Sequence, residues 1–81
     1  MSLPRDEIHG KLRALVEQAK KGAVAAEITD ETLFADLQFD SLALMELAYD
    51  VEEAFHLTIS DEELAALRTV GQLIDLIGSK T

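Results

Sequence analysis

The feature that most constrains this chain is a stretch in its middle that carries two separate apolar stripes. From Asp36 to Phe55 it reads DLQFDSLALMELAYDVEEAF. One stripe has the three- and four-residue spacing of a helix side that packs on a core: Leu44, Leu47, Ala48, Val51 and Phe55. A second stripe repeats at the same spacing on another side: Leu42, Met45 and Tyr49. A helix of a small domain needs one buried stripe, so the second predicts a face that meets something outside the fold.

The length and residue content limit what the chain can do. With 81 residues it is expected to form a single small domain, 1–81, with a thin core. It has no cysteine, which excludes disulfides, thiolate metal sites and a cysteine nucleophile. No apolar run approaches the roughly 18–20 residues of a membrane span, and no signal peptide precedes the first expected helix. We therefore expect a cytoplasmic protein that binds no membrane.

The charge is strongly negative and unevenly distributed. The formal net charge is −9, and between Lys21 and Arg68 every charged residue is an acid. Nucleic-acid binding depends on Lys and Arg neutralising phosphates, so this balance argues against it. A field of one sign costs stability through self-repulsion but steers basic partners toward the surface. Since it covers the segment with the second apolar stripe, we favour recognition of basic partners over a merely solvated surface.

The first part of the chain predicts one helix and a long connection. Pro4 suits the first position of a helix that runs to about Lys21, and Gly22 ends it. The connection from Gly22 to Asp40 is longer than most in compact domains and is expected to contain a short helical turn near residues 32–37.

A second helix is predicted from Ser41 to Phe55. Either Asp40 or Ser41 could supply the side chain that caps its N-terminus. Phe39, just before, could be a core anchor or a solvent-facing aromatic beside the serine; the sequence leaves both open.

Two capping boxes predict the remaining helices. Ser60 to Glu63 opens a short helix that ends near Leu67, and we expect Ile59 before it to be buried. Thr69 to Gln72 opens a further helix, which Gly78 is expected to stop. No strand-like alternation is present, so the predicted fold is all-α, a four-helix bundle of three main helices and one short helix.

Catalysis by the chain itself has little support. Ser41 is not in a G-x-S-x-G elbow, and neither His9 nor His56 has an evident orienting carboxylate. The acids show no EF-hand loop, so no metal site is predicted. We expect a protein that is not an enzyme.

The stretch D-L-x-x-D-S-L, Asp36 to Leu42, closely resembles the attachment site of acyl carrier proteins, the phosphopantetheine-binding carrier family. The resemblance extends over nearly the whole chain. It includes V-E-E-A-F at Val51 to Phe55, I-S-D-E-E at Ile59 to Glu63, and T-V-x-x-L-I at Thr69 to Ile74.

The resemblance implies that a phosphopantetheinyl transferase uses coenzyme A and magnesium to attach 4′-phosphopantetheine to the Ser41 oxygen. The thiol of that arm would carry acyl intermediates as thioesters between enzymes of fatty-acid or polyketide biosynthesis. Such partners are acyl-transferring, ketosynthase or acyl-activating enzymes with basic surfaces. Asp40 and Leu42 flank the site, and we interpret Asp40 as an element that the transferase recognises. A peptidyl or aminoacyl carrier, or an acidic interaction module without the arm, are the alternatives.

The second stripe and its acids form the predicted partner face, on a chain that we expect to be a monomer. The face comprises Leu42, Met45, Glu46 and Tyr49, with Asp50 and Glu53 at its edge. Alternatively, Met45 and Tyr49 could pack under the long connection. Two positions depart from the family pattern: Gln38 stands where these carriers usually have glycine, and Ala43 where an acid often follows Ser-Leu. Both departures indicate a specialised carrier rather than the housekeeping fatty-acid one.

Overall fold

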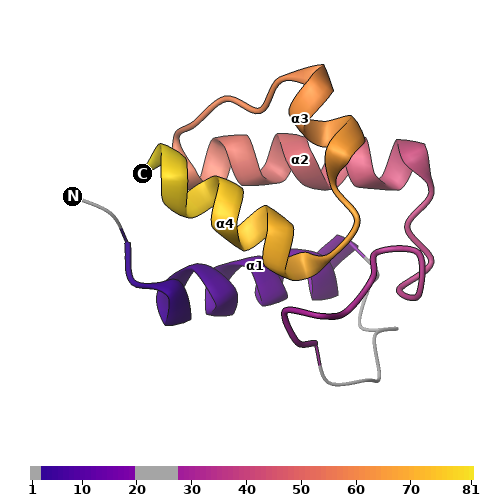
Figure 1. Ribbon diagram of the computed structural model, residues 1–81, viewed down its shortest axis with the longest axis horizontal. Helices are drawn as coiled ribbons and strands as arrows, with labels where there is room; N and C mark the ends of the chain where they lie inside the picture. Colours follow the sequence, from indigo (N-terminus) through magenta and orange to yellow (C-terminus); the bar gives the residue numbers. More distant parts are fainter. Residues whose placement is uncertain (1–2, 20–27) are drawn as a thin grey trace.

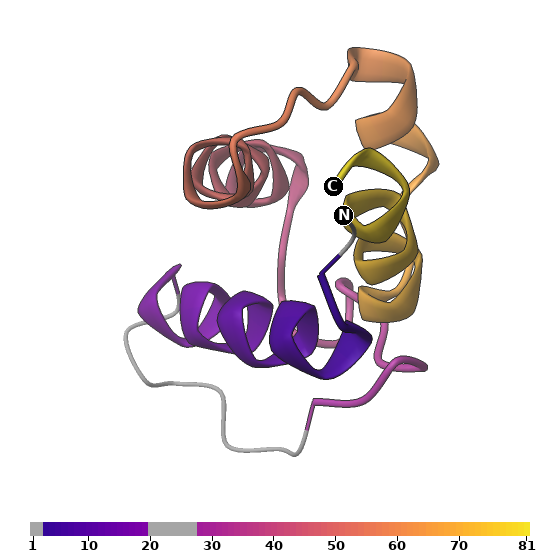
Figure 2. The ribbon, with the colours of Figure 1, turned by 90° about the vertical axis from the view of Figure 1, so that its left-hand side faces the viewer.

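The computed structural model describes residues 3–19 and 28–81, and within these ranges the regular structure is helical. The helices are α1 (Arg5–Ala19), α2 (Ser41–Phe55), α3 (Asp61–Ala66) and α4 (Val70–Lys80). Viewed from one end, α1, α2 and α4 surround a common interior, and the short α3 lies above α2 and α4 (Figures 1 and 2). The predicted all-α bundle of three main helices and one short helix is confirmed.

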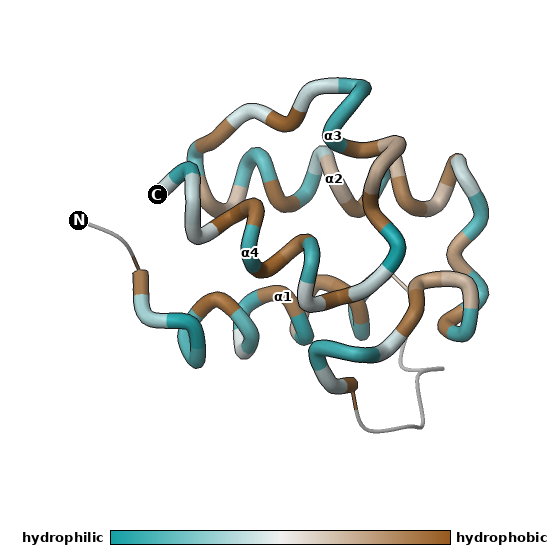
Figure 3. The backbone as a smooth tube through the Cα atoms, in the orientation of Figure 1, coloured by the Kyte–Doolittle hydropathy of each residue, from teal (hydrophilic) through white to brown (hydrophobic). Residues whose placement is uncertain are grey.

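The core is built from the faces that the three long helices turn toward one another. Apolar and polar segments alternate along each of these helices (Figure 3), as expected when one side of each helix is buried. Within residues 3–19 and 28–81, nine large side chains are fully buried: Ile8, Leu12, Val16, Leu47, Val51, Val70, Leu73, Ile74 and Ile77. The core stripe predicted for α2 is confirmed, with Leu44 half-buried at its N-terminal end. No helix in the described ranges is long and apolar enough to cross a membrane.

The helix ends follow the sequence signals with one correction. The amides of Glu7 and Ile8 donate to the carbonyl of Pro4, which therefore opens α1 as predicted. The predicted end of this helix at Lys21 and Gly22 lies outside the described residues. Gly78 does not stop α4, which continues to Lys80. A Cβ at Gly78 would lie 3.8 Å from Ile8 Cδ1, so this position faces α1. A glycine costs a helix only about 1 kcal/mol relative to alanine, and the buried Ile74 and Ile77 hold this part of α4 against the core.

The link between α2 and α3 lies at the surface. Ile59 is half-buried rather than buried, because it packs against the edge of the core from a link at the surface. Its amide donates to Glu52 Oε2 at 2.8 Å. Both predicted capping boxes are present. In the first, the hydrogen bond from the Ser60 amide, and then the contact with Lys80, lower the pKa of Glu63 below its ordinary value.

The long connection is fastened to the start of α4, and this fixes the entrance to α2. The amide of Phe34 donates to the carbonyl of Arg68 at 3.0 Å, and the amide of Gly71 donates to the carbonyl of Asp30 at 2.9 Å. The second approach requires glycine, because a Cβ at Gly71 would lie 2.8 Å from the Asp30 oxygen. Backbone bonds across this junction thus hold the connection in a single register.

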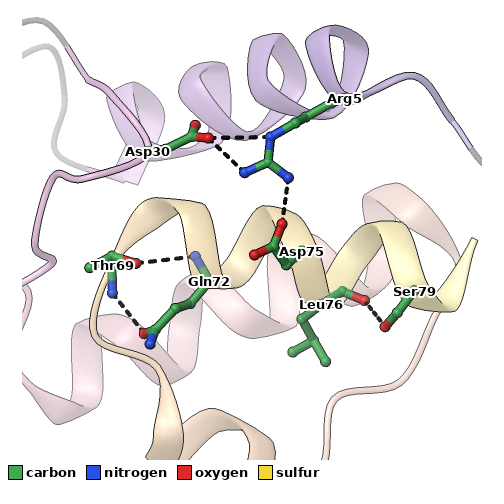
Figure 4. Close-up of polar contacts among 7 residues, drawn as sticks. All are labelled: Arg5, Asp30, Thr69, Gln72, Asp75, Leu76 and Ser79. Atoms are coloured by element: carbon green, nitrogen blue, oxygen red, sulfur yellow. Dashed lines mark hydrogen bonds and ion pairs between the residues drawn. The ribbon is translucent and has the colours of Figure 1, made fainter.

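An arginine on α1 strengthens the same junction. Arg5 binds Asp30 in the connection through Nε and Nη2, and Asp75 on α4 through Nη1 (Figure 4). These hydrogen bonds, that to Asp30 first, raise the pKa of Arg5 above its ordinary value. Since all three side chains are about half exposed or more, their main effect is to fix geometry rather than to add much stability.

Candidate functional site

The chain reaches the entrance of α2 through a buried aromatic anchor. Phe39 is buried and packs edge-to-face on Phe34, with ring centroids 5.7 Å apart and planes at 78°. Its amide donates to the Phe34 carbonyl at 3.0 Å. The sequence left open whether Phe39 is a core anchor or faces solvent; the structure shows that it is a core anchor. Its burial fixes the backbone directly before Asp40 and Ser41.

The expected turn before this anchor is present and places Gln38 in an unusual conformation. The amide of Leu37 donates to the carbonyls of Leu33 and Phe34, and that of Gln38 to the carbonyl of Ala35. Gln38 has a φ of 63°, the left-handed region that favours glycine. The departure from the family pattern thus falls at a position where the backbone itself prefers glycine.

Asp40 caps α2. Its backbone is extended, and its Oδ1 accepts a hydrogen bond from the Ala43 amide at 2.7 Å. The Asp40 carbonyl also accepts the first helical bond, from the Leu44 amide at 2.9 Å. The alternative that Ser41 serves as the cap is therefore wrong, because Asp40 occupies that role and Ser41 lies within the first turn.

Ser41 is exposed and its hydroxyl is uncommitted. It makes no hydrogen bond to the described part of the chain, whereas the other two described serines are engaged. Ser60 Oγ accepts from the Glu63 amide, and Ser79 Oγ donates to the Leu76 carbonyl (Figure 4). The amides of Ser41 and Leu42 likewise find no acceptor in the described ranges. A phosphate ester on this oxygen would therefore meet two available N–H donors at a helix N-terminus.

Two hollows flank Ser41. The larger, about 430 Å³, lies between α2 and α3, and the smaller, about 280 Å³, lies on the side of the long connection. Leu44, Leu67 and Arg68 border both of them. The remaining lining of the larger hollow is Met45, Asp61, Leu64 and Ala65. A mostly apolar hollow next to an exposed serine fits a slender group with apolar segments attached there.

The second apolar stripe of α2 lies on the surface. The exposed fractions are 63% for Leu42, 40% for Met45 and 61% for Tyr49, so the alternative that Met45 and Tyr49 pack under the connection is wrong. Glu46 is exposed beside them. Asp50 and Glu53 lie on the flank of this stripe toward α1, where they border a groove shared with Leu15 and Gln18.

The acids of this face are not neutralised by nearby cations. Within the described ranges Glu46, Asp50 and Glu53 form no ion pair. The cations there make other contacts. Arg5, Arg13 and Lys80 pair with other acids, Lys11 lies over the Phe55 ring, and Arg68 donates to the carbonyls of Ala65 and Leu67. The exposed side of α2 thus keeps its negative field.

Nothing in the described ranges forms a catalytic or metal centre around Ser41. No hydrogen bond joins its hydroxyl to a base, and no group of three or more His, Asp or Glu side chains in these ranges could hold a metal ion. What the geometry provides is an accessible hydroxyl at a rigid helix entrance.

Comparison with known proteins assigns this arrangement to a family. A family profile described as "Phosphopantetheine attachment site" matches residues 11–77. The chain belongs to the acyl carrier protein family. It is therefore a carrier rather than a catalyst, and its prosthetic group is 4′-phosphopantetheine.

Similar proteins and structures agree with this assignment. The chain is 37% identical over 78 residues to the meromycolate extension acyl carrier protein of Mycobacterium leprae, covering 95% of this chain and 67% of that one. It is 36% identical over 78 residues to an acyl carrier protein of Rhodococcus erythropolis, covering 95% and 85%. The crystal structure of the Thermotoga maritima acyl carrier protein superposes with a TM-score of 0.83 at 32% identity, covering 94% and 88%. The actinorhodin holo acyl carrier protein from S. coelicolor gives 0.72 at 32%, covering 99% and 92%.

The assignment of the cap makes a prediction about stability. Asp40→Ala should lower the free energy of unfolding by about 0.5–2 kcal/mol, because the Ala43 amide loses its acceptor. Ser41→Ala should change it by less than about 0.5 kcal/mol, since the hydroxyl makes no hydrogen bond to the described residues. Urea unfolding of the apo protein measures both. Asp40→Asn, which keeps a capping oxygen, is the control and should stay close to the parent; a larger loss for Ser41→Ala than for Asp40→Ala would contradict the assignment.

The conformation of Gln38 makes a second prediction. Gln38→Gly should be more stable than Gln38→Ala by about 0.5–1 kcal/mol, because glycine avoids the strain of the left-handed backbone at some entropic cost in the unfolded chain. Both variants lose the same side chain, so the comparison isolates the backbone. Thermal and urea unfolding provide the measurement, and an alanine variant that equals or exceeds the glycine variant would rule out the strain.

Proposed function

We propose that this protein, as a single acyl carrier domain over residues 1–81, holds acyl intermediates as thioesters on a 4′-phosphopantetheine arm attached to Ser41. It shuttles them between enzymes of fatty-acid or polyketide-type biosynthesis. The observation that carries the proposal is that Ser41, alone among the described serines, presents an exposed hydroxyl without a hydrogen-bond partner. The two other described serines support helix structure and would lose a contact on modification.

The residues around Ser41 have separate tasks in this proposal. When bound, the arm supplies a thiol, which this cysteine-free chain lacks. Asp40 holds the first turn of α2, so the Ser41 hydroxyl keeps a fixed position while a transferase approaches. The free amides of Ser41 and Leu42 can donate to phosphate oxygens. The Asp40 carboxylate, already bonded to Ala43, serves better as a recognition feature for the transferase than as a group that favours a second negative charge.

The names of two similar proteins support the pathway class. The name of the M. leprae carrier refers to meromycolate extension, and that of the S. coelicolor carrier refers to actinorhodin. We propose that the cargo here belongs to the same broad class, a growing acyl or polyketide chain. The apolar lining of the hollow between α2 and α3 suits the start of such a chain.

The exposed side of α2 is the proposed docking face for the transferase and the pathway enzymes. Leu42, Met45 and Tyr49 supply apolar contact area, and the unpaired Glu46 supplies charge. Asp50 and Glu53, on the flank toward α1, extend the negative field beyond this stripe. Charge attraction raises association rates more than it prolongs a complex, which suits a carrier that must leave each enzyme.

Intact mass tests the attachment site. Apo protein incubated with coenzyme A, magnesium and a promiscuous phosphopantetheinyl transferase should gain one phosphopantetheine. Ser79→Ala, which removes a committed hydroxyl, should gain the same mass, and Ser41→Ala should gain none. Circular dichroism of the variants checks that each one retains its helical fold. Full modification of Ser41→Ala would refute the assignment of the site.

Association kinetics test the docking face. Glu46→Lys should slow association with the transferase at low salt, because it reverses a charge on the face, and the difference should shrink as salt screens it. Glu7→Lys on α1 makes the same change of net charge away from α2 and should have a much smaller effect. Equal rates for the Glu46 and Glu7 variants at low salt would remove Glu46 from the face.

A further inference from the structure

A single arginine stands beside the proposed attachment point in a region that otherwise carries acids. Arg68 follows α3 and is the first basic residue after Lys21 in the sequence. It borders both hollows that Ser41 borders, the one between α2 and α3 and the one next to the long connection. Its backbone is fixed as well, since its carbonyl accepts from Phe34 and its amide donates to Gln72 Oε1. Arg68 is thus held at the rim where the hollows meet.

The guanidinium of Arg68 is positioned without being neutralised. Its Nη1 donates to the carbonyls of Ala65 and Leu67, at 3.0 and 3.1 Å. Its Nε and Nη2 donate no hydrogen bond to the described residues, and it forms no ion pair there. The other two arginines of the described ranges, Arg5 and Arg13, both bind carboxylates. In a chain with a net charge of −9, where acids greatly outnumber cations, a guanidinium without a carboxylate partner among the described residues is unexpected.

The acids that line these two hollows do not pair with Arg68. Asp61 borders the larger hollow and Asp40 the smaller one, and neither forms an ion pair with Arg68. Asp40 is already bonded to the Ala43 amide. The free edge of the guanidinium therefore remains available for an anion that the described residues do not supply.

We propose that Arg68 pairs with the phosphodiester of the arm on Ser41, an inference that rests on the attachment proposed above. The Nε and Nη2 donors lie on one edge of the planar guanidinium, and this edge matches two oxygens of a phosphate group. The pairing would offset the repulsion between a new negative charge and the acidic α2. It would also hold the start of the arm at the two hollows that Ser41 and Arg68 both border.

Nuclear magnetic resonance of the holo protein tests this pairing. Attachment of the arm should shift the Nε–H resonance of Arg68 relative to the apo protein, and Arg68→Gln should shift the phosphorus resonance of the phosphodiester. The matched control is Arg13→Gln, which removes the same charge from α1, where Arg13 pairs with Glu17. The control should leave the phosphorus resonance in place. Attachment should also lower the melting temperature more in Arg68→Gln than in the parent or in Arg13→Gln.

The outcomes separate this inference from the one on which it rests. A holo protein of the expected mass, in which the Arg68 resonance does not move and both glutamine variants show the parent phosphorus shift, would overturn the pairing alone. A protein whose mass does not change with a competent transferase would overturn the attachment, and the pairing with it. Both glutamine variants are exposed polar substitutions, and their amide spectra show whether the fold is retained.

Discussion

The hydrogen bond from the Ala43 amide to the Asp40 carboxylate is the interaction on which the site depends. The Asp40 side chain accepts the hydrogen bond of the Ala43 amide in the first turn of α2. The Ser41 hydroxyl is therefore not needed as a cap, and it makes no hydrogen bond to the described residues. Asp40 can do this because Phe39 is buried against Phe34, and because backbone bonds fasten the long connection to the start of α4. A carrier must present its attachment atom at a fixed place without using it to hold the fold, and this division between neighbouring residues achieves that.

The second helix serves the fold and the proposed partners at the same time. Its buried side completes a core shared with α1 and α4, and its other side exposes a short apolar stripe among unpaired acids. Many of the cations in the described ranges are placed elsewhere. Arg5 joins α1 to the connection and α4, and Lys80 pairs with Glu63 of α3. Positive charge thus fixes the geometry of junctions between elements while α2 keeps its negative field, at the cost of self-repulsion that a small core must offset.

The sequence predicted the features that depend on local pattern. The helical periodicity gave the buried side of α2, and the S-x-x-E and T-x-x-Q spacings located the starts of α3 and α4. The features that it could not predict depend on contacts between distant segments. The choice between Asp40 and Ser41 as cap depends on backbone angles set by the turn before them. Gly78 continues a helix because its neighbours Ile74 and Ile77 are buried in the core, and Ile59 stays half-buried because it packs only at the edge of that core. The neighbourhood of Arg68 and Ser41, far apart in sequence, became visible only through the fold.

The central claim is that the Ser41 oxygen bears the arm while Asp40 keeps its hydrogen bond to Ala43. A proton–phosphorus correlation spectrum of isotope-labelled holo protein tests both parts at once. The account predicts a through-bond cross-peak between the phosphorus and the β protons of Ser41, with the Ala43 amide still protected from exchange. A cross-peak to a different residue, or an Ala43 amide that loses its protection on attachment, would contradict it.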